Sequence, residues 1–523
     1  MASFSVQENS LKEVLPENTL KTRVAQTQVD REIKPAPPRY RNEIAKYIIR
    51  RNDDCVRCGK CVELCPRSVH VDKPGYMYFA EPHLDRCIGP ACEDTDHYCV
   101  SQCPQSALRM VENPMVKVLG DCRWPADMIL ATWKMAETGE LPAEEFGFDY
   151  ECGDSGGGFD KLRFKFPEKP AAEVDEDEID TSIELNKRDD GRPRIKIDVP
   201  WYGGGMSFGS VSNVTQLSKA RAAVAWNTFT CTGEGGYMER MRAFDDHVIT
   251  QVATGLFGVR EETIQRVPIV EFKYAQGAKP GLGGHLLGDK NTIAVSRMRE
   301  AVIGISLFSP FPFHSVYSIE DHMKHIDWIK HINPRALVST KVSTPTDVDM
   351  VAVGSYGTHI VHIDGGYGGT GAAPDIAKKN IAMPIEYAIG RVHRFLEAEG
   401  ARDIVTLIAS GGIRGADDIA KAIALGADGV VVGTSELIAL GCVRCSRCES
   451  GRGCPRGIAT TDAVLATKMD IEWGTQRLIN LYNAWHKGLV GILKRFGMRS
   501  VRELRGRTDL LMHLDYSNDV KAE

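Results

Sequence analysis

The sequence lacks an uninterrupted apolar run long enough to cross a membrane, and its start, MASFSVQENSLKEVLPEN, lacks the apolar core and basic flank of a signal peptide. It also has little net charge: 64 Lys and Arg oppose 70 Asp and Glu, and no basic run stands out. These absences argue against nucleic-acid and anionic-membrane binding. We therefore expect a soluble cytoplasmic protein whose partners are proteins and small molecules.

Cysteine, by contrast, is abundant and clustered. Twelve of the 15 cysteines fall in two groups, at residues 55–103 and 442–454. Disulfides would be expected in a small secreted domain, but this clustering in a chain of 523 residues indicates metal binding. A chain of this length with 43% hydrophobic residues can bury a large core and suggests about two to four folding units.

Beyond residue 190, short β-branched runs alternate with helical segments. The runs are IVEFKY (269–274), GISLFSP (304–310), ALVSTKVS (336–343), HIVHIDGG (359–366), IVTLIASGG (404–412) and GVVVGT (429–434). Strands alternating with helices indicate a parallel sheet, and most of these runs end in the small or polar residues that form the active site of a (β/α)₈ barrel. We predict an α/β TIM barrel; the alternative is an open doubly wound sheet.

The remaining parts of the chain have different compositions. We predict an extended arm at 1–50, a cysteine-rich domain at 51–113, a connecting region with an acidic linker at 114–190, the barrel at 191–460 and a helical segment at 461–523. The arm is polar and proline-containing, which favours extended structure. The acidic stretch is typical of linkers, and the last segment has apolar residues at helical spacing.

The N-terminal cysteine group consists of two runs that each end in Cys–Pro. The first run has the spacing C-x₂-C-x₂-C-x₃-C-P and contains Cys55, Cys58, Cys61 and Cys65. The second has looser first spacings and contains Cys87, Cys92, Cys99 and Cys103. In such runs three thiolates bind one iron–sulfur cubane and the fourth binds another cluster. A pair of zinc sites is the alternative, but x₃-C-P endings found twice favour iron–sulfur clusters.

Together the two runs resemble an α+β bacterial-type ferredoxin domain with two [4Fe–4S] clusters. The resemblance implies that one cluster is held by Cys55, Cys58, Cys61 and Cys103. It implies that the other is held by Cys65, Cys87, Cys92 and Cys99. The inserted loop at 93–97 departs from the ferredoxin pattern, and charge near the sulfurs tunes such centres.

From about residue 195 to 460 the chain carries several short motifs in a recognisable order. They are MSFGSVS, TCTGEGG, QVATGLFGV, AQGAKPGLGGHLLGDK, SPFPFHSVYSIED, GGYGGTGAAP and GTSELIALGC. In this order and spacing they resemble the synthase domain of glutamate synthase, in its shorter archaeal-type version. The resemblance implies FMN as cofactor and the reductive amination of 2-oxoglutarate to L-glutamate.

The loops after the last two predicted strands supply a phosphate site for FMN. Barrels commonly bind phosphate there, on backbone N–H groups and a helix N-terminus. The loop residues are Gly411, Gly412, Gly433 and Thr434. By resemblance, Ser207 and Gly209 face the flavin ring and Lys341 lies beside its N1–C2=O edge. An ion pair at the strand end is the alternative for Lys341.

The motif that starts at Gln276 is the predicted substrate site. A dicarboxylate needs two cationic partners, and Lys279 and Arg299 meet that need; the alternative for each is a solvated surface charge. The resemblance adds Gln276 and His285 as substrate contacts and implies catalytic roles for Lys279 and Glu234. His285 and Tyr237 depart from the long bacterial enzymes, so the oxo-acid and the amine channel could differ in detail.

The second cysteine group follows the predicted phosphate loop directly. Cys442, Cys448 and Cys454 match the three ligands of the family's [3Fe–4S] cluster, with one extra residue before the last. Cys445 is an additional thiol, so a [4Fe–4S] cluster is also open. A zinc site is the weaker alternative, because a redox centre beside a flavin has an evident function.

These parts imply that electrons enter through the ferredoxin-like domain, pass to the barrel cluster and collect on FMN. No amidotransferase-like region precedes the first cysteine run, so we expect ammonia from solution or from a separate glutaminase subunit. No G-x-G-x-x-G dinucleotide motif is found, so the expected donor is a ferredoxin or an NAD(P)H-oxidising flavoprotein subunit, and we expect an oligomer. The alternatives are an amine-using relative similar to N-methylglutamate synthase and an electron-transfer subunit without chemistry of its own.

Overall fold

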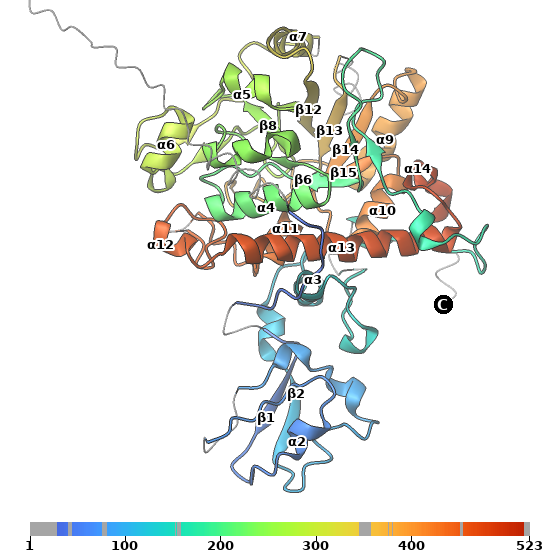
Figure 1. Cartoon of the computed structure of the whole chain (residues 1–523). Helices are drawn as coiled ribbons and strands as arrows, with labels where there is room; N and C mark the ends of the chain where they lie inside the picture. Colours follow the sequence, from blue (N-terminus) through green and yellow to red (C-terminus); the bar gives the residue numbers. More distant parts are fainter. Residues whose placement is uncertain are drawn as a thin grey trace, which may run out of the picture.

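The computed structural model describes most of the chain (Figure 1). The described residues are 29–39, 44–75, 81–151, 153, 158–318, 320–344, 357–374, 376–378, 380–449 and 453–516. Of the predicted arm, residues 1–28 and 40–43 therefore lie outside the described residues. Within the described part, no helix combines the length and apolarity needed to cross a bilayer.

Eight parallel strands close into a barrel, which confirms the predicted (β/α)₈ fold. In chain order they are β6 (Trp201–Gly203), β7 (Thr230–Cys231), β8 (Val248–Ala253), β9 (Ile269–Lys273), β12 (Leu337–Ser343), β13 (Ile360–Asp364), β14 (Thr406–Ser410) and β15 (Gly429–Val432). Each strand pairs with the next along the chain, and β15 closes the ring on β6. All residues of β8, β12, β13, β14 and β15 are buried, as expected for strands covered on both sides.

One predicted strand was wrong, and three barrel strands were not recognised. In the run 304–310 only β11 (Leu307–Phe308) is a strand, and it pairs with β10 (His285–Leu286) outside the barrel. Phe308 is 69% exposed, so this apolar run is not a core strand. The strands β6, β7 and β8 were missed because two of them are only two or three residues long and VITQVA mixes polar and apolar residues.

Helices pack around the barrel and beneath it, except α2, which lies in the N-terminal cysteine region. They are α2 (Lys60–Leu64), α3 (Ala126–Thr138), α4 (Asn213–Ala225), α5 (Glu261–Arg266), α6 (Ile293–Arg299), α7 (His322–Ile332), α9 (Ile385–Ala398), α10 (Ala416–Ala424), α11 (Thr434–Ala439), α12 (Ala463–Ala466), α13 (Ile471–Phe496) and α14 (Val501–Leu504). The long helix α13 runs across the barrel below α4 and α10 and contacts α3 (Figure 1). It begins at an Asp470 N-cap and ends at Gly497 in the left-handed conformation.

The segment predicted as an acidic linker packs against the same core as the barrel. Val174, Ile179, Ile183 and Leu185 are buried in the hydrophobic cluster that contains the barrel strands. Two short antiparallel strand pairs lie in or beside this part of the chain: β4 (Ile183–Glu184) pairs with β5 (Lys196–Ile197), and β3 (Leu162–Phe164) pairs with β16 (Leu511–His513). The acidic side chains lie outside, as in the exposed turn η6 (Glu176–Glu178).

The N-terminal cysteine region lies below α3 as a small separate lobe in Figure 1. Its two-stranded sheet pairs β1 (Tyr47–Arg51) with β2 (Leu108–Glu112) in antiparallel register. Between these strands lie α2 and the short turns η1 (Leu84–Arg86) and η2 (Gly89–Cys92). The chain leaves β2 through η3 (Pro114–Val118) and enters α3, which packs on α11 and α13 of the main body.

Candidate active site and cysteine clusters

A cavity of about 780 Å³ opens where the carboxyl ends of the barrel strands meet. It brings together all but one of the site residues that were predicted in the barrel. These residues come from segments up to 247 positions apart, from Ser207 to Cys454. The predicted residues that line it are Ser207, Glu234, Gln276, Lys279, His285, Arg299, Lys341, Gly411, Gly412, Gly433, Thr434, Cys442, Cys445, Cys448 and Cys454. Gly209 does not line it, but a Cβ there would lie 3.1 Å from Arg299 Nη2.

The predicted phosphate loops follow β14 and β15 directly. Gly411 and Gly412 both have φ of +100°, a conformation that favours glycine, and a Cβ on Gly411 would lie 2.5 Å from Gly365 O. A Cβ on Gly433 would meet nothing within 4 Å, so its backbone faces open space. Thr434 begins α11, and Ser435 Oγ ties that turn to Ile413 O at 2.7 Å. The two loops thus form a backbone-lined cradle at one end of the cavity.

Lys341 lies on β12 inside the barrel and faces the cavity. It is 9% exposed, and its Nζ lies 3.4 Å from Asp364 Oδ2 at the end of β13. Burial opposes its charge, but Asp364 and Glu271 outweigh burial and raise the pKa of Lys341. Lys341 therefore forms the ion pair that was the alternative expectation, and its ammonium is held charged at the cavity wall. Its place beside a flavin stays a prediction.

A buried hydrogen-bond network supports Lys341 from below. Glu271 accepts hydrogen bonds from Gln251 at 2.7 Å and Ser339 at 2.9 Å, and pairs with His362 Nδ1 at 2.9 Å. Burial alone would raise the pKa of Glu271, but His362 and Lys341 lower it to about 2. This network joins β8, β9, β12 and β13, and it fixes the interior charges before any ligand is bound.

The network continues to the cavity floor through Ser410. His362 Nε2 lies 2.7 Å from Ser410 Oγ, which donates to Asp364 Oδ1 at 2.6 Å. The other oxygen of Asp364 accepts the Gly277 N–H at 3.0 Å, one residue after Gln276. Asp364 therefore links the cofactor side of the cavity to the predicted substrate loop.

The predicted substrate side contains three cations around one carboxylate. Lys273, which the sequence analysis did not identify, pairs with Glu234 Oε1 at 3.0 Å. Burial alone would raise the pKa of Glu234, but Lys273, Lys279 and Arg299 hold it below its usual value. Glu234 is thus an ionised carboxylate in a positive surrounding.

Lys279 and Arg299 are not solvated surface charges. Lys279 is 3% exposed, and burial together with the neighbouring Lys273 lowers its pKa to about 8. Arg299 is 6% exposed and donates through Nη2 to Ser207 Oγ at 2.9 Å and Phe208 O at 3.2 Å. Its Nε has no hydrogen-bond partner among the described residues. Both cations therefore have donors available for an anionic ligand.

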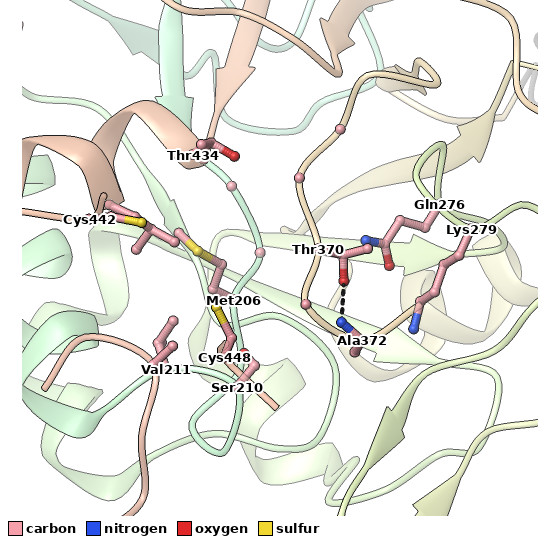
Figure 2. A pocket seen from close by; sticks show the side chains of 18 of the residues that line it. Met206, Ser210, Val211, Gln276, Lys279, Thr370, Ala372, Thr434, Cys442 and Cys448 are labelled. Atoms are coloured by element: carbon pink, nitrogen blue, oxygen red, sulfur yellow. Dashed lines mark hydrogen bonds between the residues drawn. The ribbon is translucent and has the colours of Figure 1, made fainter. Parts of the chain in front are cut away.

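The four barrel cysteines lie on the opposite side of the cavity from the substrate loop. Figure 2 shows Cys442 and Cys448 near Met206, with Gln276 and Lys279 across the pocket. Burial raises the pKa of the Cys442 thiol to about 12 and also raises that of Cys448, and the proximity of Cys454 adds to both shifts. Cys445 is exposed. The Arg444 backbone N–H donates to Cys442 Sγ at 3.4 Å. The loop has the character of a cluster site beside the cavity.

The structure also gathers four of the N-terminal cysteines around one small apolar pocket of about 30 Å³. They are the set that the ferredoxin resemblance assigns to one cluster: Cys65, Cys87, Cys92 and Cys99. The two Cys–Pro turns are built alike: Cys65 Sγ accepts the Val69 N–H at 3.5 Å and Cys103 Sγ accepts the Ala107 N–H at 3.3 Å. This internal repeat matches the two-fold pattern of the sequence.

The other predicted set is more open. Cys58 is exposed, and Arg51 donates to Cys61 Sγ at 3.8 Å. Burial raises the pKa of the Cys61 thiol, with a smaller contribution from the nearby Cys55. In the described part of the chain, no three His, Cys, Asp or Glu side chains converge on a position for a single metal ion. Cys65, Cys87, Cys92 and Cys99 surround a small space instead, and that arrangement fits thiolates on the corners of a multi-iron cluster.

Several cavity residues were missed from the sequence because they are distant along the chain. Asp121 and Trp124, from the turn before α3, line the cavity, and Asp121 pairs with Arg444 at 2.6 Å. Glu449, directly after Cys448, pairs with the buried Lys290 at 3.0 Å. Of these residues, Lys290 was indicated in the sequence, because it ends the GLGGHLLGDK motif.

The cavity fits FMN in shape and chemistry. Its glycine cradle offers backbone N–H groups to a phosphate, and Met206, Val211 and Val431 supply an apolar wall for a flat ring. Lys341 places a fixed positive charge at the same wall. The three regions lie in one continuous space, as a phosphate-bearing ring system requires.

Comparison with known proteins agrees with this geometry. Residues 158–499 match the conserved region of glutamate synthase. Archaeal-type glutamate synthase [NADPH] of Thermotoga maritima is 35% identical over 491 residues, which cover 89% of this chain and 94% of that protein. Archaeal glutamate synthase [NADPH] of Methanocaldococcus jannaschii is 35% identical over 502 residues, covering 91% and 95%.

Among solved structures, the flavin-binding domain of baker's yeast flavocytochrome b2 is similar at a TM-score of 0.42 and 18% identity, covering 70% of this chain and 81% of that one. The similarity is too low to add to the argument. The sequence matches extend over nearly the full length of the archaeal-type relatives and include the cavity and its motifs. The chain therefore belongs to the glutamate synthase family.

Proposed function

We propose that this protein makes L-glutamate by reductive amination of 2-oxoglutarate, with FMN in the barrel and iron–sulfur clusters feeding it electrons. The observation that carries the proposal is the single cavity in which two buried cations, Lys279 and Arg299, face a glycine cradle and a cysteine loop. Ammonium, two electrons and two protons convert the oxo-acid to glutamate and water. Each of these inputs has a matching group in the cavity.

FMN would be held by the two phosphate loops, by Ser207 near the ring and by Lys341. When bound, FMN supplies the hydride for the imine carbon and can exchange one electron or two. The charge on Lys341 favours a negatively charged ring edge, and the Glu271 network keeps that ammonium in place.

The substrate carboxylates are best matched by Arg299 and Lys279. Arg299 is anchored through Nη2, which fixes the orientation in which its guanidinium would meet one carboxylate. Lys279 lies across the cavity from the wall assigned to the flavin. Its loop is held by the hydrogen bond from the Gly277 N–H to Asp364. His285 and Gln276 complete the lining and fit the keto oxygen.

Proton transfer is assigned to Lys279 and charge stabilisation to Glu234. Nζ of Lys279 has its pKa lowered to about 8, so it can donate a proton near neutral pH to the oxygen that leaves as water. Glu234 is kept ionised by Lys273 and stabilises the cationic imine that forms before reduction. Because both groups are buried, these charges are only weakly screened.

The N-terminal cysteines would hold two [4Fe–4S] clusters, and the barrel cysteines a [3Fe–4S] or [4Fe–4S] cluster. The electron donor would be a ferredoxin or an NAD(P)H-oxidising flavoprotein subunit, and ammonia would come from solution or a glutaminase subunit. The curated relatives carry NADPH in their names. NADPH would therefore be oxidised by a partner subunit, and we expect the protein to work as an oligomer.

An anaerobic single turnover tests the function. The purified holoprotein is reduced with dithionite, 2-oxoglutarate and ammonium are added, and flavin absorbance and glutamate are followed. We expect flavin reoxidation with stoichiometric glutamate, lost in Lys279→Ala and retained in the control Lys494→Ala, whose lysine pairs with Glu176 on the surface. Reoxidation by another amine or oxo-acid, with none by this pair, would contradict the proposal.

A further inference from the structure

Two phenylalanines outside the barrel form a stacked pair between the two cysteine regions. The rings of Phe146 and Phe148 are 5.4 Å apart between centroids and inclined by 7°. Phe146 is 6% exposed and Phe148 is half-buried. The pair lies in and just after the turn η4 (Glu144–Phe146), which follows α3 and belongs to neither cysteine region. Its position therefore calls for an explanation beyond the core packing of either part.

On one side, the pair contacts the N-terminal region at one cysteine set. Arg67, two residues after Cys65, lies over the Phe146 ring at 5.2 Å and pairs with Glu145 at 3.6 Å. The turn η2, which ends at Cys92, packs on η4. Both cysteines line the small pocket described above, so the Cys65, Cys87, Cys92 and Cys99 set is the one that faces the stacked pair.

On the other side, the pair leads to the barrel cysteines. Phe148 packs on a compact hydrophobic cluster that contains Trp124 and Trp133, and Cys442 packs on the same cluster. Trp133 Nε1 also donates to Ile438 O at 2.8 Å, in the helix just before Cys442. The contact from Cys92 to Cys442 is therefore continuous and runs mostly through aromatic and apolar side chains.

Two further ion pairs hold this junction in register. Lys134 of α3 pairs with Asp85 of η1 at 3.5 Å and also lies over the Phe146 ring. Lys46, just before β1, pairs with Asp127 of α3 at 3.0 Å. Both pairs join the N-terminal region to α3, which is anchored on the main body. They fix the distance between the two cysteine regions.

The other cysteine set lies on the far side of this region. Figure 1 shows α2, which contains Cys61, at the end of the lobe away from α3. Cys58 is exposed, and the nearby Arg57 pairs with Asp72 of the same lobe at 3.2 Å. This side is open to an electron-donating partner.

We propose that the Phe146–Phe148 pair is the electron-transfer junction of the protein. The Cys65, Cys87, Cys92 and Cys99 set stands on its inner side, and the Cys55, Cys58, Cys61 and Cys103 set receives electrons from an external one-electron donor. Each step moves one electron from a reduced cluster to an oxidised one, with no bond made or broken. The inference rests on the proposed function, because it assigns the route by which that site is reduced.

The test measures electron movement inside the holoprotein without substrate. A flash-generated one-electron reductant reduces the N-terminal clusters, and flavin reduction is followed by absorbance. In Phe148→Ala we expect the intramolecular rate constant to fall by about tenfold, equivalent to about 1.4 kcal/mol in the barrier. Iron content, flavin content and the EPR signals of the clusters should be unchanged.

The chain offers a matched control in a second phenylalanine stack. Phe166 is half-buried, stacks on Phe496 with centroids 4.8 Å apart and lies beneath Arg495, at the C-terminal end of α13. Phe166→Ala should leave the rate constant unchanged. Equal rates in Phe148→Ala and Phe166→Ala, with all cofactors present, would overturn the junction.

A second pair of variants tests the order of the clusters. Arg67→Gln removes the contact with Glu145 and Phe146, whereas Arg57→Gln removes a contact within the outer side. Compared at equal driving force, Arg67→Gln should slow the intramolecular step and Arg57→Gln should not. Slowing by Arg57→Gln alone, or equally by both, would overturn the order.

The outcome is independent of the proposed reaction. The flash experiment needs neither 2-oxoglutarate nor ammonium, so the junction is judged even if no glutamate forms. Conversely, dithionite-reduced Phe148→Ala should still form glutamate in the single turnover. Loss of glutamate in every variant and in the parent would count against the reaction and leave the junction result standing.

Discussion

The two cysteine-bearing regions of this protein are stabilised in different ways. Among the described residues of 51–113, the fully buried apolar side chains are Val69, Ala107 and Leu108. The barrel strands and the helices around them share one continuous hydrophobic core. A region with so little apolar burial needs another source of stability, and its eight clustered cysteines supply one if they bind metal. From this comparison we predict that in the outer region cluster binding and folding depend on each other.

Removing iron should produce the largest difference in stability between the two regions. On anaerobic chelation we expect residues 51–113 to lose their structure completely, because metal binding and folding are coupled in small metal domains. The barrel should keep its circular dichroism and its cooperative melt. Limited proteolysis with mass spectrometry identifies the cleavage sites. Protection of 51–113 after iron loss would contradict the comparison.

Within the barrel, the largest single-residue effect should come from Glu271. Glu271→Gln removes the charge that His362 and Lys341 depend on and leaves their network unbalanced, which should cost about 3–5 kcal/mol of unfolding free energy. Urea unfolding followed by fluorescence measures it. The control Glu239→Ala changes an exposed carboxylate and should stay within about 0.5 kcal/mol. Similar midpoints for the two variants would show that the network does not support the barrel.

The cavity cations should affect turnover more than folding. Removing Arg299 as Arg299→Ala should lower kcat/KM for 2-oxoglutarate by about 30- to 1000-fold, or about 2–4 kcal/mol, because a buried charge partner is lost. Steady-state kinetics with a reducing system measures it. Arg335→Ala, at an exposed position before β12, is the control. An unchanged kcat/KM in Arg299→Ala would remove Arg299 from the substrate site.

The pH dependence of substrate capture should follow Lys279. Its ammonium is charged below about pH 8 and is lost as pH rises through that value, because burial and Lys273 lower its pKa while Glu234 and Glu449 oppose the shift. We expect kcat/KM for 2-oxoglutarate to fall by about tenfold per pH unit above that point. Lys279→Arg keeps its charge at this pH and should abolish the fall of kcat/KM. If kcat/KM falls in the same way in Lys279→Arg, the pH dependence belongs to another group.

The smallest effect should come from a surface contact between the connecting region and α13. Lys487 pairs with Glu140 at 2.6 Å, and both side chains are about half exposed. Lys487→Ala should change the unfolding free energy by less than about 1 kcal/mol, because exposed ion pairs contribute little. Thermal unfolding measures it. A larger loss would show that docking of 114–150 on α13 depends on this pair.

Sequence patterns predicted the fold class because the barrel repeats local information. Five of the six predicted runs became barrel strands, since each is rich in β-branched and other apolar residues and is followed by a helical segment. The run 304–310 failed because two apolar residues in a hairpin, Leu307 and Phe308, look like a core strand in isolation. The short strands β6 and β7 were invisible because their pairing comes from neighbours in space.

The candidate site was predictable where a motif placed several functional residues together, as around Gln276 and Lys279. Lys273 was missed because a lysine at the end of an apolar strand has no local sign of its partner, and Glu234 lies 39 positions earlier. Asp121 was missed for the same reason: its partner Arg444 is 323 residues away. The predicted roles of the site residues stay predictions until kinetics test them.

By itself, the sequence determined which cysteines group together, which loops are rich in glycine and which runs are apolar, because these properties depend on residues that are close along the chain. Only the tertiary structure decided that Glu234 is surrounded by three cations, that the Glu271 network supports Lys341, and that Phe146 and Phe148 lie between two cysteine regions. Those features depend on closing the barrel and docking the N-terminal lobe, which bring distant residues into contact and bury their charges together.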